Sequence, residues 1–297
     1  MKVLILGATG MLGREIFRSF STFEKYDLIT SGRMSMAQSR QHIQCDMLKD
    51  DIFSKIEDIN PDVVIYCSAN TSVPNCEKNK EATEKLHAVI PSKIAKTINK
   101  FVYVSTDSVF DGTGAPYTEK SPVSPINFYA KSKVMGEELV AASSESAMIV
   151  RTNIFGFDSV HHGSLVEWAI RNMQKGHRMN GFTDLYFNAI SVMQLASCLE
   201  FLIGVKYEGV INVAGDYSIS KYDFLVKIAK MLGYDAELVS PTISTDFFDA
   251  PRPKNTTLSV EKLKQLGFTD IKLETGLNYI QAKVRDTKCQ LSISTDA

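Results

Sequence analysis

Near its start the chain reads VLILGATGMLG at residues 3–13, and this stretch decides how the rest is interpreted. Its first four residues form a short, continuous apolar run, which is typical of a strand buried on both faces. A GxxGxxG pattern follows at once, and residues 14–20 have helical spacing. We expect Gly7 to permit a tight turn, Gly10 to let the backbone approach a pyrophosphate, and Gly13 to let helix and strand pack closely.

Free N–H groups at the start of a helix face outward and favour negative charge, so this turn predicts a dinucleotide-binding site. The alternative is a strand-to-helix turn that needs glycine for backbone reasons alone. The position of the pattern, between a buried strand and a helix, favours the dinucleotide. The contacts expected from this segment are Gly7, Thr9, Gly10, Met11, Leu12 and Gly13.

Strand-like and helix-like segments then alternate through the first half of the chain. Apolar runs predict strands at residues 27–30, 62–67, 101–104 and 147–151. Helical spacing predicts helices at residues 81–99 and 127–142, the first kinked or split by Pro91. Such alternation implies a parallel sheet covered on both sides. The predicted fold class is therefore α/β, a Rossmann-type doubly wound parallel sheet with a smaller C-terminal substrate-binding region.

The second half is less regular. It predicts helices at 165–174, 192–203 and 222–232, the last capped by Ser220 and ended by Gly233, and a strand at 209–213. We predict a dinucleotide-binding domain at residues 1–155 and a mainly substrate-binding region at 156–285, with later segments free to return to the sheet. Residues 286–297 form a polar tail that is a candidate for disorder.

The composition excludes several classes of partner. The chain has 297 residues, with 33 basic and 34 acidic side chains, so its net charge of −1 does not favour nucleic acid or a membrane surface. No apolar run approaches the roughly 20 residues of a membrane span, and no signal peptide is evident after Met1. Five scattered cysteines without a CxxC pair indicate free thiols in a reducing compartment. We expect a cytoplasmic protein.

The end of the second predicted strand bears on the choice of dinucleotide. An acid there would hold the ribose 2′-hydroxyl of NAD, but the sequence reads Ser31-Gly32-Arg33. Arg33 could pair with a 2′-phosphate, although an exposed surface arginine is the alternative. We therefore predict NADPH, with NADH as the second choice. Asp46, followed by Met47, is a candidate contact for the adenine, its alternative being a solvated loop acid.

Tyr129 and Lys133 lie four residues apart near the start of a predicted helix, and so on one face of it. A phenol has an unperturbed pKa of about 10, and a nearby ammonium group lowers the pKa by stabilising the phenolate. Such a tyrosine can protonate a carbonyl oxygen as hydride arrives at the carbon. Thr106 ends the preceding strand and supplies a hydroxyl for the same oxygen, unless it only caps a local turn.

Tyr217 and Lys221 have the same spacing, which shows that the pattern alone is weak evidence. Tyr217 lies in a turn-like stretch at 215–218, where no helix would align the two side chains. Tyr129 instead follows a strand that ends in Ser105-Thr106-Asp107, and strand ends carry the reacting groups in this architecture.

Three motifs together resemble the extended short-chain dehydrogenase/reductase family: GATGMLG at 7–13, STDSVFDG at 105–112 and YAKSK at 129–133. Within it, the chain is most similar to dTDP-4-dehydrorhamnose reductases, which use NAD(P)H to reduce the 4-keto group of a dTDP-linked 6-deoxy sugar. Arg151-Thr152 resembles the pair that ends their next strand, and residues 251–258 resemble their RPxNSxL stretch. The likeness runs from Met1 to about Asp270 and is looser in the second half.

The resemblance implies a catalytic triad of Thr106, Tyr129 and Lys133, with Lys133 and Tyr129 also touching the cofactor. It implies a nucleotide-diphosphate keto sugar as the substrate, and a homodimer is one alternative for the assembly. Cofactor contacts after the third strand would be Ser68, Ala69 and Asn70. The substrate contacts would be Asp107, Ser108, Asn153, Ile154 and Arg252, with Arg252 near the diphosphate.

Two departures concern the sugar pocket. Ser108 stands where the family has a tyrosine, and Ile154 stands where it often has a tryptophan. Both changes remove an aromatic ring that would face the substrate, so they bear on which sugar and base are bound. His161-His162 has no acid or cysteine cluster beside it, so we expect a polar loop there and no metal.

Three functions remain open. The first is a 4-ketoreductase. The second is an epimerase of the same fold; a 4,6-dehydratase is disfavoured, because the Asp-Glu pair that commonly follows its threonine is Asp107-Ser108 here. The third is a non-catalytic regulatory subunit that binds a dinucleotide, like the beta subunit of methionine adenosyltransferase, which resembles the same family.

Overall fold

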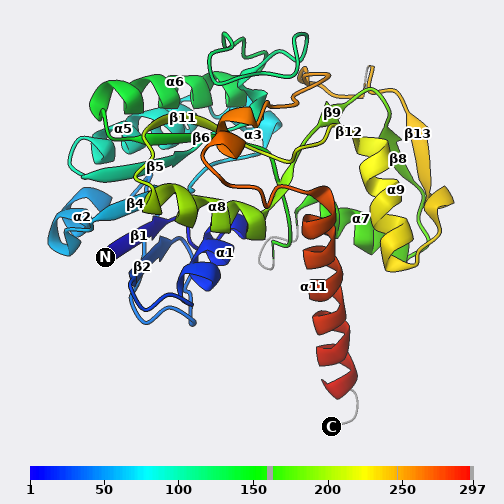
Figure 1. Ribbon diagram of the computed structural model, residues 1–297, viewed down its shortest axis with the longest axis horizontal. Coiled ribbons are helices and arrows are strands. Elements are labelled where there is room, and N and C mark those ends of the chain that lie inside the picture. Colours follow the sequence, from blue (N-terminus) through cyan, green and yellow to red (C-terminus); the bar gives the residue numbers. More distant parts are fainter. Residues whose placement is uncertain (159–162, 246, 295–297) are drawn as a thin grey trace.

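A seven-stranded parallel sheet forms the centre of the molecule, with strand order β11-β6-β5-β4-β1-β2-β3 (Figure 1). The computed structural model describes residues 1–158, 163–245 and 247–294, with side chains up to residue 286. The predicted α/β doubly wound class is confirmed. The strands of this sheet are β1 (Lys2–Leu6), β2 (Asp27–Gly32), β3 (His42–Gln44), β4 (Val63–Tyr66), β5 (Lys100–Val104), β6 (Met148–Thr152) and β11 (Gly209–Val213).

Successive residues of each central strand serve two different cores, because side chains alternate between the faces of a sheet. In β1, Val3 and Ile5 belong to one core, while Leu4 and Leu6 belong to the other. The first core contains α1 (Met11–Phe20) and α8 (Val192–Gly204). The second contains α2 (Ile52–Ile59), α5 (Ile90–Ala95) and part of α6 (Phe128–Ser143). This explains why the strands are continuous apolar runs.

The strand order reverses at β1, which has β2 on one side and β4 on the other. In open α/β sheets ligands bind beyond the carboxyl ends of the strands at such a point. The turn at residues 7–13 leaves β1 at that place and enters α1. The fold therefore puts the glycine pattern where a dinucleotide is bound in this architecture.

The region predicted as one helix at 81–99 is helical, but it is not a single regular α-helix. The chain forms α3 (Val73–Lys78), α4 (Lys80–Glu84), a π-helical turn η1 (Lys85–Val89) and then α5, which ends at Ala95. Pro91 lies in the first turn of α5, where a missing N–H is tolerated, and the expected irregularity of this helix falls just before it, at η1. A π-helical turn often marks a functional site, and η1 contains the buried His87.

The remaining segments form small paired strands and helices beside the central sheet. Strands β7 and β10 pair in parallel, β8 and β13 pair in parallel, and β9 and β12 pair antiparallel. The strands are β7 (Ile154–Phe155), β8 (Met179–Phe182), β9 (Tyr186–Phe187), β10 (Ile190–Ser191), β12 (Ile219–Ser220) and β13 (Val239–Thr242). The helices are η2 (Asp107–Val109), α7 (Leu165–Gln174), α9 (Lys221–Leu232), η3 (Ala236–Leu238), α10 (Glu261–Gln265) and α11 (Leu273–Ser294).

Several elements differ from the sequence prediction. The short β3 and α2 were not predicted, because neither has a strong enough period over so few residues. In agreement with the expectation that later segments could return to the sheet, β11 follows residue 155 and pairs with β6 in the central sheet. The candidate for disorder, residues 286–294, continues α11, since no glycine or proline interrupts it after Gly276. The first half of α11 packs on the core, where Leu277 and Ile280 are buried, and its C-terminal end projects away from the rest of the molecule (Figure 1). Within the described residues, no helix is both long and apolar enough to cross a bilayer.

Candidate active site

The turn between β1 and α1 is shaped for a phosphate. Gly7 has a φ of 87°, and a Cβ built there would lie 2.8 Å from the Ser68 backbone nitrogen. A Cβ at Gly10 would meet only the Gly7 carbonyl, at 3.5 Å, so this position is open. No side chain caps the start of α1, which leaves the N–H groups of its first turn for a ligand. These features fit the pyrophosphate of a dinucleotide.

Gly10 and Gly13 are predicted to separate ligand binding from folding. A Cβ at Gly13 would lie 2.4 Å from the Gly7 carbonyl oxygen, and backbone cannot move aside as a side chain can. Gly13→Ala is therefore expected to lower the free energy of unfolding by about 1–3 kcal/mol. Gly10→Ala should keep that free energy but bind NADPH about tenfold or more weakly. Urea unfolding and NADPH titration test both, and a stable Gly13→Ala would contradict the packing role of Gly13.

The residues expected to read the adenosine end surround this turn. Arg33 follows β2 and is exposed, which leaves its guanidinium free to meet a 2′-phosphate or solvent. Thr9 packs against Gly32, where a Cβ would lie 2.6 Å from the Thr9 hydroxyl. Gly32 was not singled out from the sequence. Asp46 accepts a hydrogen bond from the Leu48 N–H at 3.1 Å. Met47, beside it, is buried.

Thr106 and Tyr129 meet at the carboxyl end of β5. Thr106 lies two residues beyond that strand, and Tyr129 is the second residue of α6, after its capping residue Asn127. The Tyr129 phenol lies close enough to the Thr106 side chain to interact with it. Burial raises the pKa of Tyr129 to about 12, against the smaller lowering effects of Thr106 and of Arg252. The phenol is therefore protonated at neutral pH, as a proton donor must be.

Lys133 differs from the expectation in its effect on the phenol. Its ammonium group donates to the Val104 carbonyl oxygen at 2.7 Å and lies 3.9 Å from the centroid of the Tyr103 ring. Burial lowers the pKa of Lys133 to about 7, although Glu137 and Cys67 raise it. The expected lowering of the Tyr129 pKa by Lys133 does not occur: desolvation raises that pKa, and the groups that oppose the rise are Thr106 and Arg252. What the structure confirms is placement: Lys133 lies one helical turn beyond Tyr129 and is buried.

Asp107 is a buried hub that joins three distant segments. Its carboxylate accepts hydrogen bonds from the Asn153 amide at 2.7 Å and from the Thr256 hydroxyl. The Thr106 and Ser108 hydroxyls also donate to it, at 3.2 and 3.3 Å. Asp107 is 2% exposed, so its oxygens are directed at protein groups. Asp107 and Asn153, predicted as substrate contacts, therefore hold the site's segments together. The role of Thr256 could not be inferred from the sequence, because it depends on a contact between distant segments.

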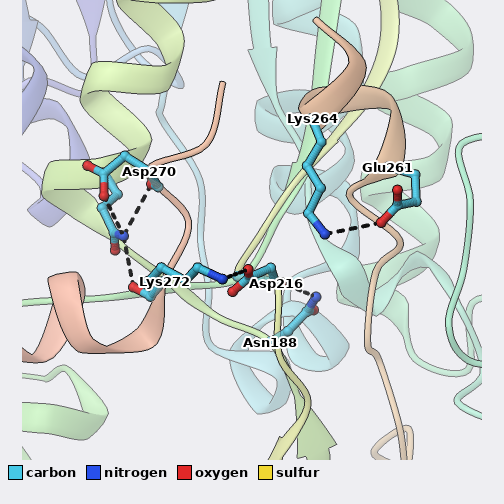
Figure 2. A network of polar contacts seen from close by, with 8 residues as sticks. Asn188, Asp216, Glu261, Lys264, Asp270 and Lys272 are labelled. Carbon is cyan, nitrogen blue, oxygen red and sulfur yellow. Dashed lines mark hydrogen bonds and ion pairs between the residues drawn. The ribbon is translucent and has the colours of Figure 1, made fainter. Parts of the chain in front are cut away.

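The segment that carries Thr256 and Arg252 is clamped by Asn188. The Asn188 amide donates to the carbonyl oxygens of Gly215 and Leu258, both at 2.8 Å, and its oxygen accepts from the Leu258 N–H. Close to Asn188, Asp216 forms an ion pair with Lys272 at 2.5 Å (Figure 2). This buried amide fixes residues 255–258 relative to β9 and so sets the position of the Thr256 hydroxyl.

Arg252 and Lys221 place positive charge beside the candidate catalytic residues. The Nε of Arg252 is buried without a hydrogen-bond partner, and its guanidinium lies 5.4 Å from the Phe248 ring centroid. Lys221 lies 3.4 Å from the centroid of the Phe187 ring. Burial lowers the pKa of Lys221 to about 8, and nearby Asp107 raises it. In the sequence, Lys221 stood out only through its spacing from Tyr217. Its position near Asp107 arises from the tertiary structure.

The rest of the predicted site is distributed as follows. Ile154 is the first residue of β7 and is partly exposed. The Ser108 hydroxyl donates a hydrogen bond to the Asp107 carboxylate. Tyr217 donates to the Ala189 carbonyl oxygen, away from Tyr129, in agreement with its exclusion. His161-His162 lies outside the described residues. Among residues that are described, no group of three or more His, Cys, Asp or Glu side chains is arranged to hold a metal ion.

The profile of the RmlD substrate binding domain family matches residues 1–285. The chain belongs to this family. It is similar to methionine adenosyltransferase 2 subunit beta of Mus musculus, with 27% identity over 90% of this chain and 82% of that protein. It is equally similar to the probable low-salt glycan biosynthesis reductase Agl14 of Haloferax volcanii, with 27% identity over 96% of this chain and 99% of that protein.

Solved structures agree with this family assignment. A dTDP-4-dehydrorhamnose reductase from Bacillus anthracis, crystallised with NADP, superposes with a TM-score of 0.84 and 26% identity. The match covers 95% of this chain and 99% of that one. The resemblance inferred from three short motifs is thereby confirmed over nearly the whole chain. Membership of the RmlD substrate binding domain family does not by itself separate a reductase from a regulatory subunit.

Proposed function

We propose that the protein is an NADPH-dependent reductase of the 4-keto group of a nucleotide-linked 6-deoxy sugar. The proposal rests on the residues at the end of β5 and the start of α6, where Tyr129 lies beside Thr106 and the Lys133 ammonium group donates to the Val104 carbonyl oxygen. Strand β4 lies between β5 and β1, the strand that leads into the glycine turn. The NADP bound by the Bacillus anthracis reductase, and the glycan reductase among the relatives, support the same class of reaction.

In this proposal the bound dinucleotide supplies a hydride to the carbonyl carbon of the sugar. The Tyr129 phenol, protonated at neutral pH, gives its proton to the carbonyl oxygen, and the Thr106 hydroxyl donates a hydrogen bond to the same oxygen. Lys133 holds the ribose next to the nicotinamide. Arg252, whose Nε lacks a partner, and Lys221 attract the diphosphate of the sugar nucleotide.

NADPH oxidation, followed by absorbance, tests the proposal with 4-keto-6-deoxy sugars linked to dTDP, UDP and GDP. Turnover of one member is the expected result, and it would make Ser108 and Ile154 the positions to exchange when the sugar preference is mapped. An epimerase would interconvert the sugars without net NADPH consumption.

A regulatory subunit is the second candidate, because the relatives include methionine adenosyltransferase 2 subunit beta at 27% identity. Tight NADPH binding without turnover of any keto sugar, together with a stable complex with a methionine adenosyltransferase catalytic subunit, would favour it. The complete set of Thr106, Tyr129 and Lys133 weighs for the enzyme.

Arg33→Ala tests the choice of dinucleotide. If the exposed guanidinium pairs with the 2′-phosphate, we expect NADPH to bind about 10- to 100-fold more weakly while NADH binding changes less than threefold. Fluorescence titration with both cofactors measures this. Arg40→Ala, which removes another exposed arginine of the same connection, is the matched control. Equal losses for NADPH and NADH would mean that Arg33 does not contact the 2′-phosphate.

A further inference from the structure

His87 is a buried residue for which the proposed reaction has no use. It lies at the centre of the π-helical turn η1 and is 0% exposed. Its Nε2 is 2.9 Å from the backbone nitrogen of Asn70, and its Nδ1 is 2.8 Å from the hydroxyl of Ser132. The ring therefore bridges the loop after β4 and the helix that carries Tyr129.

The partners determine which ring nitrogen carries the proton. A backbone N–H can only donate, so Nε2 of His87 accepts from Asn70. The proton of the neutral ring is then on Nδ1, which donates to the Ser132 hydroxyl, and that hydroxyl donates to the Tyr129 carbonyl oxygen at 2.8 Å. Burial, with a smaller contribution from the charge of Lys133, lowers the pKa of His87 to about 3, so this state persists at every physiological pH.

Further contacts press His87 against α6. Its ring meets the Tyr129 ring edge-on, with centroids 5.8 Å apart and an interplanar angle of 87°. Its carbonyl oxygen accepts from the Tyr103 hydroxyl at 2.6 Å. A Cβ at Gly136 would lie only 2.2 Å from that carbonyl oxygen, so the helix approaches η1 as closely as glycine permits. The His87 ring thus contacts the loop at Asn70, the Ser132 hydroxyl and the Tyr129 ring, while its backbone carbonyl oxygen accepts from Tyr103.

We propose that His87 is a positioning residue: it ties the cofactor-lining loop at Asn70 to the first turn of α6, so that the phenol of Tyr129 is aligned with the bound dinucleotide. This inference rests on the proposed function. A π-helical turn suits the task, because such turns occur frequently at functional sites. Small misplacements of reacting groups cost up to about 100-fold in rate, so the effect should be large for a residue that never touches substrate.

The test compares His87→Leu, Ser132→Ala and the double variant with the unaltered full-length protein. We measure kcat and KM with NADPH and the keto sugar that the panel identifies, NADPH affinity by fluorescence, and the melting temperature. We expect kcat to fall about 30- to 100-fold in His87→Leu and about tenfold in Ser132→Ala, with the KM for the sugar unchanged within threefold. The double variant should be no slower than His87→Leu, since both changes break the same chain of hydrogen bonds.

Tyr66→Phe is the matched control. The buried Tyr66 hydroxyl donates to the Leu86 carbonyl oxygen at 2.6 Å, so this change removes a hydrogen bond from the same turn without touching the His87 chain. It should lower the melting temperature about as much as His87→Leu yet keep kcat within twofold. Equal loss of kcat in Tyr66→Phe, or a kcat for His87→Leu within threefold of the unaltered protein, would overturn the proposal.

If no sugar is reduced and the proposed function fails, NADPH affinity still tests the positioning role of His87. Breaking the bond to Asn70 should weaken NADPH about three- to tenfold in His87→Leu, whereas Ser132→Ala should leave the affinity unchanged. His87→Gln keeps an acceptor for the Asn70 N–H and should recover most of that affinity. Equal affinities in His87→Leu and the unaltered protein would overturn the link between His87 and the cofactor loop.

Discussion

Tyr129→Phe is expected to reduce turnover by about 1,000-fold or more while NADPH binds within twofold of its original affinity. The change removes only the hydroxyl that is to protonate the carbonyl oxygen, and proton transfer by a positioned group contributes about 100- to 10,000-fold. With a pKa of about 12, the Tyr129 hydroxyl carries its proton at neutral pH, so removing the hydroxyl removes the proton donor. Steady-state kcat and a fluorescence titration of NADPH measure the two quantities.

Tyr217→Phe is the matched control for removing a tyrosine hydroxyl. Tyr217 has the same spacing to a lysine, but its hydroxyl donates to the Ala189 carbonyl oxygen. Its loss should cost some stability and leave turnover within threefold. Undiminished turnover in Tyr129→Phe would remove this residue as the proton donor and direct attention to Lys221, a titratable group near Asp107 whose pKa is lowered to about 8.

The first half of the fold could be predicted because its signals are local. Strands buried on both faces must be continuous apolar runs, and β1, β4 and β5 show this plainly. The glycine turn adds a second local signal, since Gly7 and Gly13 are required by backbone contacts. By contrast, β3 has one apolar residue among three, and its place in the sheet is determined by pairing with β2. No local pattern reports such a pairing.

The candidate site shows the same division. Thr106, Tyr129 and Lys133 could be singled out because each has a characteristic position relative to a strand or a helix. Their supporting partners could not be: His87 lay inside a predicted helix with no mark of a π-helical turn. Thr256 reaches Asp107 across 149 positions of the sequence. Support of this kind arises only when distant segments are brought together, so it is visible in the structure alone.

The expected direction of the Tyr129 pKa failed for a physical reason. The sequence placed Lys133 one turn away and so suggested a lowered value, but it could not report how deeply both groups are buried. Burial raises the pKa of Tyr129 and lowers that of Lys133, because the charged form of each is disfavoured in an apolar environment. For reduction this keeps the phenol protonated, which is the useful state.

Arg151→Met should lower the free energy of unfolding by about 3–5 kcal/mol. Arg151 and Glu137 are each 5% exposed and form an ion pair with a closest distance of 2.7 Å, joining β6 to α6. Without the guanidinium, the Glu137 carboxylate stays buried with the Ser105 hydroxyl as its donor among the bonds described. An unpaired charge in the interior is costly, so the midpoint of urea unfolding should fall sharply.

Lys264→Met is the control, because its partner Glu261 is exposed and pairs of this kind contribute about 0–1 kcal/mol (Figure 2). Adding Glu137→Leu to Arg151→Met removes the stranded charge and should restore most of the lost free energy. The turnover of the double variant shows whether the ion pair serves folding alone or also orients α6 and Tyr129. If the double variant is stable but has reduced turnover, the pair orients α6 and its tyrosine. If it is stable and fully active, the pair serves folding alone. An Arg151→Met protein as stable as the original would contradict the predicted cost of the buried carboxylate.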